Sequence, residues 1–246
     1  MNDLQENLTL ITCSHNTPEV TMNLLRSFAM HHKSYPYNLL ISENSTDEKT
    51  CELLDAQEIK YFRNPGMMHA DGMNFLFKRC KTKHALLLDT DIIFLKNLEE
   101  AYDEFVEENF ALCGEYNDAQ RGGKLLYPRI APWFCFVDME KLKANNIEFE
   151  DMELFESNNR DPKKLRKYDV ACTMYEKVMR ARLKFGPLAT THGLFKHYEG
   201  MSWRTFWYEN GKHTNKIVYE WGKSVQKQYD LETKKFLNVS VKGFFK

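Results

Sequence analysis

The chain has 246 residues, and 43% of them are hydrophobic, so it is long enough to bury one substantial core. Its formal net charge of -1 at pH 7 provides no overall basic field, which argues against nucleic acid as the main partner. The first residues are polar, and no apolar run approaches the ~20 residues of a membrane helix, so we expect a cytoplasmic protein with neither signal peptide nor transmembrane segment.

Short apolar runs alternate with amphipathic stretches through the first hundred residues. The runs predict buried strands, and apolar residues at helical spacing predict helices between them. The predicted strands are residues 8–12, 38–42, 59–62 and 84–88, and the predicted helices open at Pro18, at Thr46 or Asp47, and at Asp71. Alternation of this kind favours right-handed βαβ units, so we expect an α/β fold with a mostly parallel central sheet flanked by helices.

The pattern changes after Leu98. The stretch EEAYDEFVEENF predicts a solvated acidic helix. The later predicted elements are strands at 111–115 and 133–138, loops at 121–124 and 151–167, and a helix at 169–183. We expect one domain over residues 1–205, followed by a short helical C-terminal extension over residues 206–246.

Polar clusters follow each of the first four predicted strands. Their sequences are CSHN, SENSTD, RNPG and DTD. Because ligands bind outside the carboxyl ends of the strands in open α/β sheets, the four clusters predict a binding site at that edge.

The triplet Asp89-Thr90-Asp91 lies between the apolar runs LLL and IIFL. Two carboxylates at i and i+2 can point to one side of a strand end, where they repel each other unless a cation or hydrogen bonds compensate. A hard oxygen site of this kind suits Mg²⁺ or Mn²⁺ bridging a diphosphate. A turn with helix-capping acids is the alternative for the triplet alone, and its place on the fourth strand favours the metal site.

The four blocks LITCSHN, ISENSTDE, RNPGMMHADGMN and HALLLDTDIIFL, in this order and spacing, resemble family 2 glycosyltransferases of the GT-A fold. The resemblance covers residues 8–100 well and residues 127–205 loosely, and the tail is unmatched. It implies a nucleotide-donor half over residues 1–100 and an acceptor half over residues 101–205.

The resemblance also implies an activity. The expected enzyme moves a sugar, with inversion, from a nucleotide-diphosphate donor to a hydroxyl of a glycan or lipid-linked saccharide, and it uses Mn²⁺ or Mg²⁺. A UDP-sugar is the first donor to consider, and GDP- and dTDP-sugars are the alternatives. By analogy, the role is surface polysaccharide synthesis, with which peripheral membrane contact is compatible.

Positions in the first two blocks carry over as donor-binding residues. Cys13, Ser14 and His15 would hold the base and ribose, and His15 stands where the family often has a stacking tyrosine. Glu43 stands where the family has an aspartate that accepts a hydrogen bond from a pyrimidine ring, so the longer acid leaves the base preference open. Asn44 starts the turn beside it.

The third block would approach the diphosphate or the donor sugar through His69 and Asp71. Met73 occupies the place of the family's usual basic residue, so phosphate neutralisation must come from elsewhere.

The fourth block and a distant histidine would form the metal site. Asp91 would be the direct ligand, Asp89 would support the metal or contact the ribose, and Thr90 would lie against the donor. His197, in HYEGMSW, resembles the histidine that completes the metal site in many GT-A enzymes, and an imidazole is a suitable third ligand for Mn²⁺. His192 is the rival candidate.

An inverting transfer needs a general base to remove the proton of the acceptor hydroxyl. Asp169 is the candidate because it opens a predicted helix, where the helix dipole also favours an acid. A simple capping role for Asp169 and the acids of residues 150–156 remain alternatives. Trp133, in the sequence PWF, is either an aromatic platform for a sugar ring or a core residue.

Two other functions stay open. A sugar-phosphate nucleotidyltransferase also uses metal carboxylates, but it normally has a Gly-rich basic loop after the first strand, which CSHNTPEV lacks. A catalytically silent nucleotide- or carbohydrate-binding protein would be expected to lack Asp91 or the base candidate, and both acids are present. The six cysteines form no CxxC pair and fit buried thiols in a reducing compartment.

Overall fold

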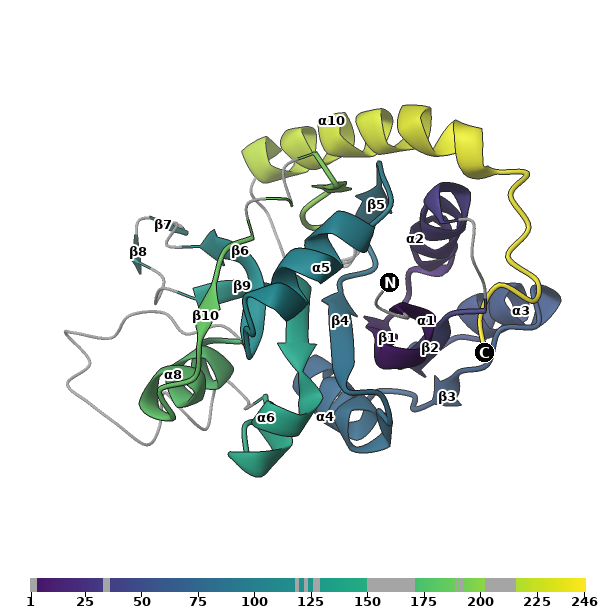
Figure 1. The fold of residues 1–246 in the computed structure, drawn as a ribbon. Helices are drawn as coiled ribbons and strands as arrows, with labels where there is room; N and C mark the ends of the chain where they lie inside the picture. Colours follow the sequence, from purple (N-terminus) through teal and green to yellow (C-terminus); the bar gives the residue numbers. More distant parts are fainter. Residues whose placement is uncertain are drawn as a thin grey trace.

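The computed structural model describes residues 4–32, 36–117, 120–121, 124–125, 129–149, 171–188, 190, 193–201 and 216–246. Strands and helices alternate through the first half of the chain (Figure 1). In chain order, the strands are β1 (Leu8–Ser14), β2 (Asn38–Glu43), β3 (Phe62–Arg63), β4 (His84–Leu88), β5 (Ile92–Phe94), β6 (Leu112–Asn117), β7 (Gln120–Arg121), β8 (Lys124–Leu125), β9 (Arg129–Asp138), β10 (Phe185–Gly186) and β11 (Phe195–His197). The helices are α1 (Leu4–Asn7), α2 (Pro18–His31), α3 (Lys49–Ala56), α4 (His69–Arg79), α5 (Glu99–Glu107), α6 (Met139–Ala144), α8 (Cys172–Arg180), α10 (Lys216–Thr233) and the 3-10 helix η2 (Lys234–Phe236).

A seven-stranded sheet in the order β10-β6-β9-β4-β1-β2-β3 forms the centre of the described chain. β1 pairs in parallel with both β2 and β4, and its register sets Thr12 beside Ile41 and Leu88. β9 runs antiparallel between β4 and β6. The predicted α/β fold with a mostly parallel sheet is therefore confirmed, and the carboxyl ends of β1, β2 and β4 meet at one edge.

Helices cover both faces of the sheet. α2, α3 and α5 pack on one face, with Phe28 and Tyr102 among the buried side chains. α4, α6 and α8 pack on the other face, with Leu76 and Met174 in its core (Figure 1). Every residue of β1 and β4 is buried, which explains why these strands read as continuous apolar runs instead of alternating ones.

The third strand is shorter than predicted. β3 covers only the last residue of the predicted run and the residue after it. The reason is the end of α3: Glu58 has a φ of 58°, and the N–H of Ile59 donates back to Leu54 O at 3.0 Å. The helix terminus therefore uses residues that would otherwise pair with β2.

Two predictions for the second half are wrong in detail. α5 is not wholly solvated, because Ala101, Tyr102 and Phe105 are buried on one face. The two aromatic residues lie three positions apart and so share a side of the helix. The loop predicted at 121–124 contains residues of β7 and β8, which pair as two short antiparallel strands.

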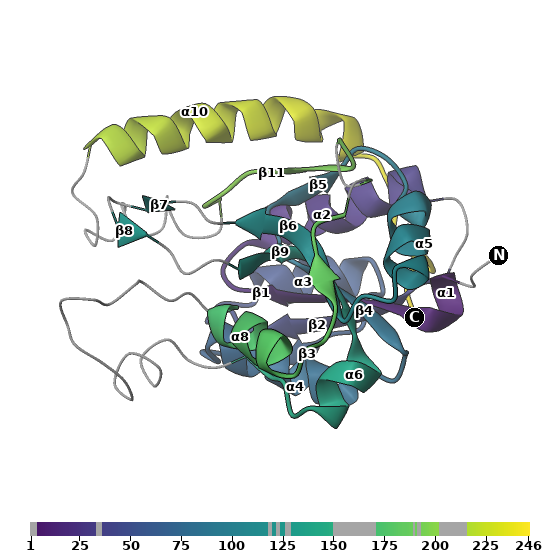
Figure 2. The ribbon, with the colours of Figure 1, turned by 60° about the vertical axis from the view of Figure 1, so that its left-hand side comes forward.

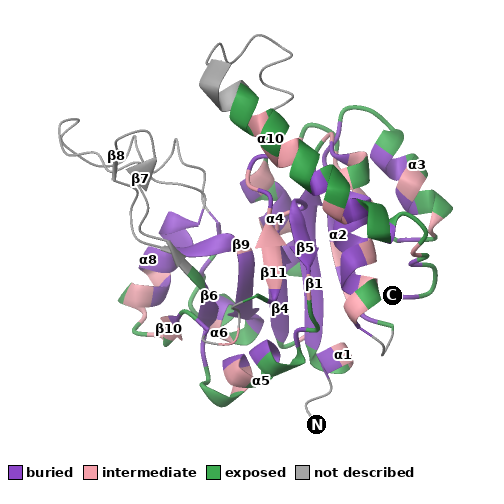
Figure 3. Ribbon diagram, turned by 90° about the horizontal axis from the view of Figure 1, so that it is seen from above, coloured by how far each residue is buried: buried purple, intermediate pink, exposed green. Residues whose placement is uncertain are grey.

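The C-terminal segment is more than a helical extension. α10 crosses one side of the molecule (Figure 2), and much of its outer surface is exposed (Figure 3). The last residues then return to the edge of β2, where the N–H of Tyr37 donates to Phe244 O at 3.0 Å and the N–H of Lys246 donates to Tyr37 O at 2.9 Å. Val241 and Phe244 are buried in the same core cluster as α2.

Two further expectations concern membrane-spanning helices and the state of the cysteines. Among the described residues, no helix combines the length and apolar character that crossing a membrane requires. All six cysteines are buried and free.

Candidate active site

The acidic triplet lies in a tight connection between β4 and β5. The N–H of Asp89 donates to Trp133 O at 3.0 Å, which ties the start of the connection to β9. Asp91 is only 2% exposed and Thr90 only 3%, whereas Asp89 is half-buried. The triplet is therefore part of the sheet edge, as its sequence position predicts.

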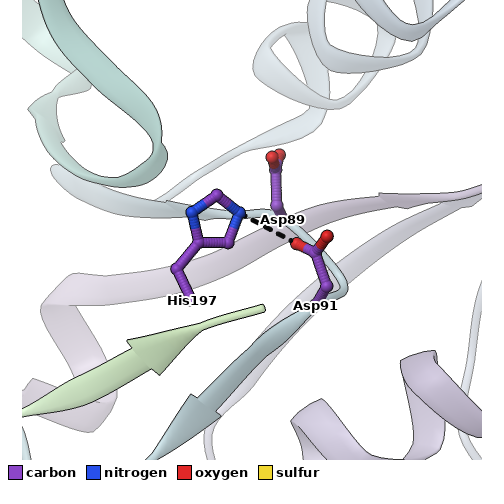
Figure 4. A group of neighbouring side chains, drawn as sticks. All are labelled: Asp89, Asp91 and His197. Atoms are coloured by element: carbon purple, nitrogen blue, oxygen red, sulfur yellow. Dashed lines mark ion pairs between the residues drawn. The ribbon is translucent and has the colours of Figure 1, made fainter. Parts of the chain in front are cut away.

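β11 brings His197 to this triplet. It pairs antiparallel with β5, in a register that sets His197 beside Ile92, and the N–H of Tyr198 donates to Asp91 O at 2.9 Å. The Nε2 atom of His197 lies 3.2 Å from Oδ1 of Asp91 (Figure 4). One ligand atom from each of Asp89, Asp91 and His197 lies within 4.8 Å of the other two. We call these three residues the metal triad.

The charges and hydrogen bonds of the metal triad fit a divalent cation. The N–H of Gly200 donates to Asp91 Oδ2 at 3.1 Å, and the buried Oδ1 of Asp91 faces the Nε2 atom of His197 at 3.2 Å. Burial lowers the pKa of His197, but the neighbouring carboxylates of Asp91 and Asp89 outweigh burial and raise it. A cation would replace the proton in balancing these carboxylates, and two carboxylates with one imidazole suit Mn²⁺ or Mg²⁺.

Trp133 fixes the plane of the imidazole. Its indole stacks on the His197 ring with centroids 4.9 Å apart and an interplanar angle of 23°, and its Nε1 donates to Glu115 Oε2 at 3.4 Å. In the predicted platform PWF, Trp133 alone is partly exposed, because Pro132 and Phe134 are buried. Trp133 therefore lies beside the metal triad instead of in a core centre.

A second group of residues, which we call the donor rim, consists of the loops 14–17 and 43–48 and the first turn of α4. Hydrogen bonds join the two loops directly. The N–H of Asn44 donates to Ser14 O at 2.8 Å, and the N–H of Asn16 donates to Ser45 Oγ at 2.7 Å. The exposed His15 lies with its Nδ1 3.0 Å from Asn44 O. The carboxyl ends of β1 and β2 thus form one continuous polar edge.

Three predicted donor-site side chains have partners inside the protein. Ser14 Oγ is hydrogen-bonded to Thr21 Oγ1 at 2.8 Å, and Asn44 Oδ1 accepts from Ser42 Oγ at 2.6 Å. Burial raises the pKa of the Cys13 thiol, which therefore stays protonated. These side chains shape the donor rim, and direct contact between them and a nucleotide stays a prediction.

Glu43 is fully buried at the end of β2. Its Oε1 accepts the N–H of Ser45 at 2.7 Å and lies 3.6 Å from Arg63 Nη1. Its Oε2 is buried, and no described residue donates a hydrogen bond to it. A buried carboxylate oxygen without a donor is costly, so this oxygen is a ready acceptor for a ligand N–H group.

The first turn of α4 packs against the two loops. His69 is half-buried and Asp71 is exposed, while Met73 is buried in the core and offers no charge to a phosphate. Gly72 permits the close approach, because a Cβ atom there would lie 2.9 Å from both Asn44 Nδ2 and Cys13 Sγ. His69 and Asp71 therefore belong to the donor rim, and their contact with a donor stays a prediction.

Sequence reasoning missed two residues of the site. Arg63 donates to Ser45 O through Nη1, and its Nη2 donates to Asp47 O at 3.0 Å and to Glu48 Oε1 at 2.9 Å. Gly200 has a φ of 86°, which favours glycine, and its N–H reaches Asp91. A basic residue directly before the NPG turn was the available signal for Arg63. The candidate base Asp169, its competitors at 150–156 and the rival His192 lie outside the described residues.

Solved glycosyltransferase structures share this fold. The mannosyltransferase PcManGT of Pyrobaculum calidifontis, in complex with GDP-Man and Mn²⁺, matches with a TM-score of 0.55 at 9% identity, over 96% of this chain and 73% of that one. GlyE of Streptococcus pneumoniae TIGR4 matches with a TM-score of 0.54 at 10% identity, over 96% and 64%. S. aureus TarS 1-349 matches with a TM-score of 0.50 at 15% identity, over 75% and 58%. These similarities establish the GT-A fold.

The sequence profile described as "Glycosyl transferase family 2" matches residues 9–179, which is more than half of the chain. The chain therefore belongs to glycosyl transferase family 2, and the predicted resemblance is confirmed. The chain spans 30% of the length of a longer S. aureus TarS chain and 58% of TarS 1-349. A search among curated protein sequences returned no significant match.

Proposed function

We propose that this chain is a metal-dependent glycosyltransferase that moves a sugar from a nucleotide-diphosphate donor to a hydroxyl of a saccharide. The observation that carries this proposal is the metal triad, three ligand residues gathered at the carboxyl end of β4 in a family 2 GT-A fold. The same triad argues against a catalytically silent binding module, since such a module has no need of two carboxylates and an imidazole gathered within 4.8 Å of one another.

Asp89, Asp91 and His197 would hold the cation, which when bound stabilises negative charge on the leaving diphosphate. Gly200 fixes one oxygen of Asp91 through its N–H, and this contact leaves the second oxygen to the cation. Trp133 holds the imidazole of His197 in its plane. Two of the three ligands, Asp91 and His197, are thus oriented by a neighbour, which metal sites generally require for affinity.

The donor rim would bind the nucleotide through Glu43, whose free oxygen favours a base with a ring N–H group. Uracil, thymine and guanine each have one, which supports a UDP-sugar first and dTDP- or GDP-sugars next. The complex of PcManGT with GDP-Man and Mn²⁺ supports keeping GDP-sugars among the candidates. Cys13, Ser14, His15, Asn44, His69, Asp71 and Thr90 complete the proposed donor site.

For the acceptor half we propose an inverting transfer with Asp169 as the general base, acting on a glycan or lipid-linked saccharide. Trp133, partly exposed beside the metal triad, supports a sugar acceptor because apolar sugar faces pack on aromatic rings. The free buried cysteines support a cytoplasmic location. Synthesis of surface polysaccharide, with peripheral membrane contact, is the proposed role.

A donor screen tests the proposal. Release of nucleoside diphosphate from UDP-, GDP- and dTDP-sugars is measured with Mn²⁺, with Mg²⁺ and with EDTA. We expect release from one donor class and its loss in EDTA. Nucleotide binding that is independent of metal, without turnover of any donor, would contradict the proposal and indicate a binding module.

Two substitutions assign the roles. Asp91→Asn should fold, as judged by circular dichroism, and lose turnover by about 10³-fold together with metal-dependent donor binding. Asp169→Asn should lose about 10²–10⁴-fold in kcat while donor affinity stays unchanged. Full activity in Asp169→Asn would remove this residue as the base and leave the metal site untouched.

A further inference from the structure

The strand that carries His197 is too short to hold its own position. β11 and its partner β5 contain three residues each. A two-stranded ribbon is at best marginally stable by itself, so other elements must fix the orientation of β11. His197 also lies beyond residue 179, where the family match ends.

The side chains around β11 alternate between two faces. Phe195 and His197 stack on aromatic residues of β9, on the side of the main sheet. Lys196 and Tyr198 project to the opposite side, where the Lys196 Nζ lies 4.7 Å from the centroid of the Tyr198 ring. In Figure 2, β11 runs between α10 and the main sheet, so this opposite side faces α10.

α10 contacts that side at two points. Lys196 Nζ forms an ion pair with Glu232 Oε1 at 2.6 Å. The ring of Tyr198 meets the ring of Tyr229 edge to face, with centroids 5.0 Å apart. Tyr229 is 2% exposed, and its hydroxyl accepts a hydrogen bond from Asn23 Nδ2 of α2 at 3.2 Å. The residues on either side of His197 are thus both held by α10, which is itself anchored to α2.

We propose that α10 positions His197 for metal binding, with Tyr229 and Glu232 as positioning residues that act through β11. Holding Lys196 and Tyr198 prevents rotation of the strand about its axis, and such a rotation would move the imidazole away from Asp91. The inference rests on the proposed function, because the cation is that of the proposed transfer. Loss of residues that orient a metal ligand typically lowers metal affinity about 10–100-fold.

The test measures the dissociation constant for Mn²⁺, from the electron paramagnetic resonance signal of free Mn²⁺, on the full chain without nucleotide. Tyr229→Ala is expected to raise this constant about tenfold, and Glu232→Gln about threefold, because one contact remains in each variant. Tyr229→Phe keeps the ring contact and should stay within about twofold of the wild type.

Glu220→Gln is the matched control, because Glu220 is an exposed acid on the same helix and the substitution removes the same charge. It should leave the constant unchanged. If Tyr229→Ala fails to fold, as judged by thermal unfolding, the Mn²⁺ dissociation constants of Glu232→Gln and Lys196→Met test the positioning role instead. Wild-type Mn²⁺ affinity in these two variants overturns the positioning role alone. Absence of Mn²⁺ binding in the wild type overturns both this role and the proposed function.

Discussion

The donor rim and the metal triad lie at the same edge of the sheet but are built in different ways. The donor rim is assembled from segments within residues 14–72, and its loops are joined by short hydrogen bonds between neighbouring strand ends. The metal triad joins His197 to acids far away in the sequence, and the Gly200 N–H that supports Asp91 also lies 109 positions from it. Its support comes from β9 and, as we propose, from α10.

This difference predicts that the two parts of the site fail independently. A change in the donor rim should weaken nucleotide binding and leave metal affinity intact. A change at the metal triad should weaken metal binding and leave metal-free nucleotide binding intact. Metal-free nucleotide binding, measured by calorimetry in EDTA with UDP and GDP, reports on the rim. Binding of Mn²⁺ without nucleotide reports on the triad.

The largest separation is expected from His197→Ala. Asp89 and Asp91 remain, but the loss of one of three ligands should raise the Mn²⁺ dissociation constant about 100-fold. Metal-free nucleotide binding should change less than about twofold, because His197 contacts Asp91 and Trp133, which lie outside the donor rim. His69→Ala, the same substitution at the rim, should leave Mn²⁺ binding unchanged. An equal loss of Mn²⁺ affinity and of metal-free nucleotide affinity in His197→Ala would show that the donor rim and the metal triad are coupled.

The sequence predicted the parts of the site that depend on local pattern. The polar clusters after the strands predicted that Glu43 and the acidic triplet lie at one edge of the sheet, and the family resemblance carried by HYEGMSW predicted that His197 joins the triplet. A basic residue before the NPG turn was a signal for Arg63, but the pattern could not show what Arg63 contacts or that the N–H of Gly200 reaches Asp91, because both depend on distances between segments far apart in the sequence. It also could not show that α10 packs on β11, since a helix with a mixed polar surface gives no indication of its partner.

The next effect is a loss of folding stability at low pH, caused by His32, which anchors the segment after β5. His32 Nδ1 donates to Phe28 O at 2.7 Å, and its Nε2 accepts the N–H of Leu98 at 3.1 Å, so the folded state requires a neutral ring. Burial lowers the pKa of His32 from 6.5 to about 4. The unfolded chain therefore binds a proton that the folded chain excludes, and stability present above pH 6.5 is lost as the pH falls toward 4. Urea unfolding should show a loss of about 2 kcal/mol from this residue between pH 7 and pH 5.

His32→Gln tests this assignment because glutamine does not titrate in this range. The variant should be less stable than the wild type at pH 7, since Phe28 O or Leu98 N–H loses its partner. It should lose about 2 kcal/mol less than the wild type on acidification to pH 5. Parallel curves for the two proteins would show that other groups cause the acid sensitivity.

Gly72→Ala should act on the donor rim alone. The added Cβ would lie 2.9 Å from Asn44 Nδ2 and Cys13 Sγ, so these buried side chains must shift. Overpacking of this kind costs about 1–3 kcal/mol, and we expect a rise of about tenfold in the donor KM with a lower melting temperature. Lys78→Ala, at an exposed position of the same helix, is the control. A weaker Mn²⁺ affinity in Gly72→Ala would contradict the independence of the two parts.

The smallest effect is expected from Arg63→Gln, which tests how the donor rim is held in shape. The Arg63 guanidinium binds Ser45 O, Asp47 O and Glu48 Oε1 and lies beside the buried carboxylate of Glu43. Without it the loop loses three hydrogen bonds, although its hydrogen bonds to the loop after β1 remain, so the donor KM should rise about fivefold with unchanged Mn²⁺ affinity.

Arg63→Lys should recover only part of this loss, because one ammonium group cannot reproduce the forked contacts of a guanidinium. Arg180→Gln makes the same change at a side chain that is 71% exposed on α8, and it should leave the donor KM unaltered. A fully active Arg63→Gln would mean that the hydrogen bonds between the two loops suffice to hold Glu43. The shape of the donor rim would then depend on the hydrogen bonds between its two loops, without a contribution from β3.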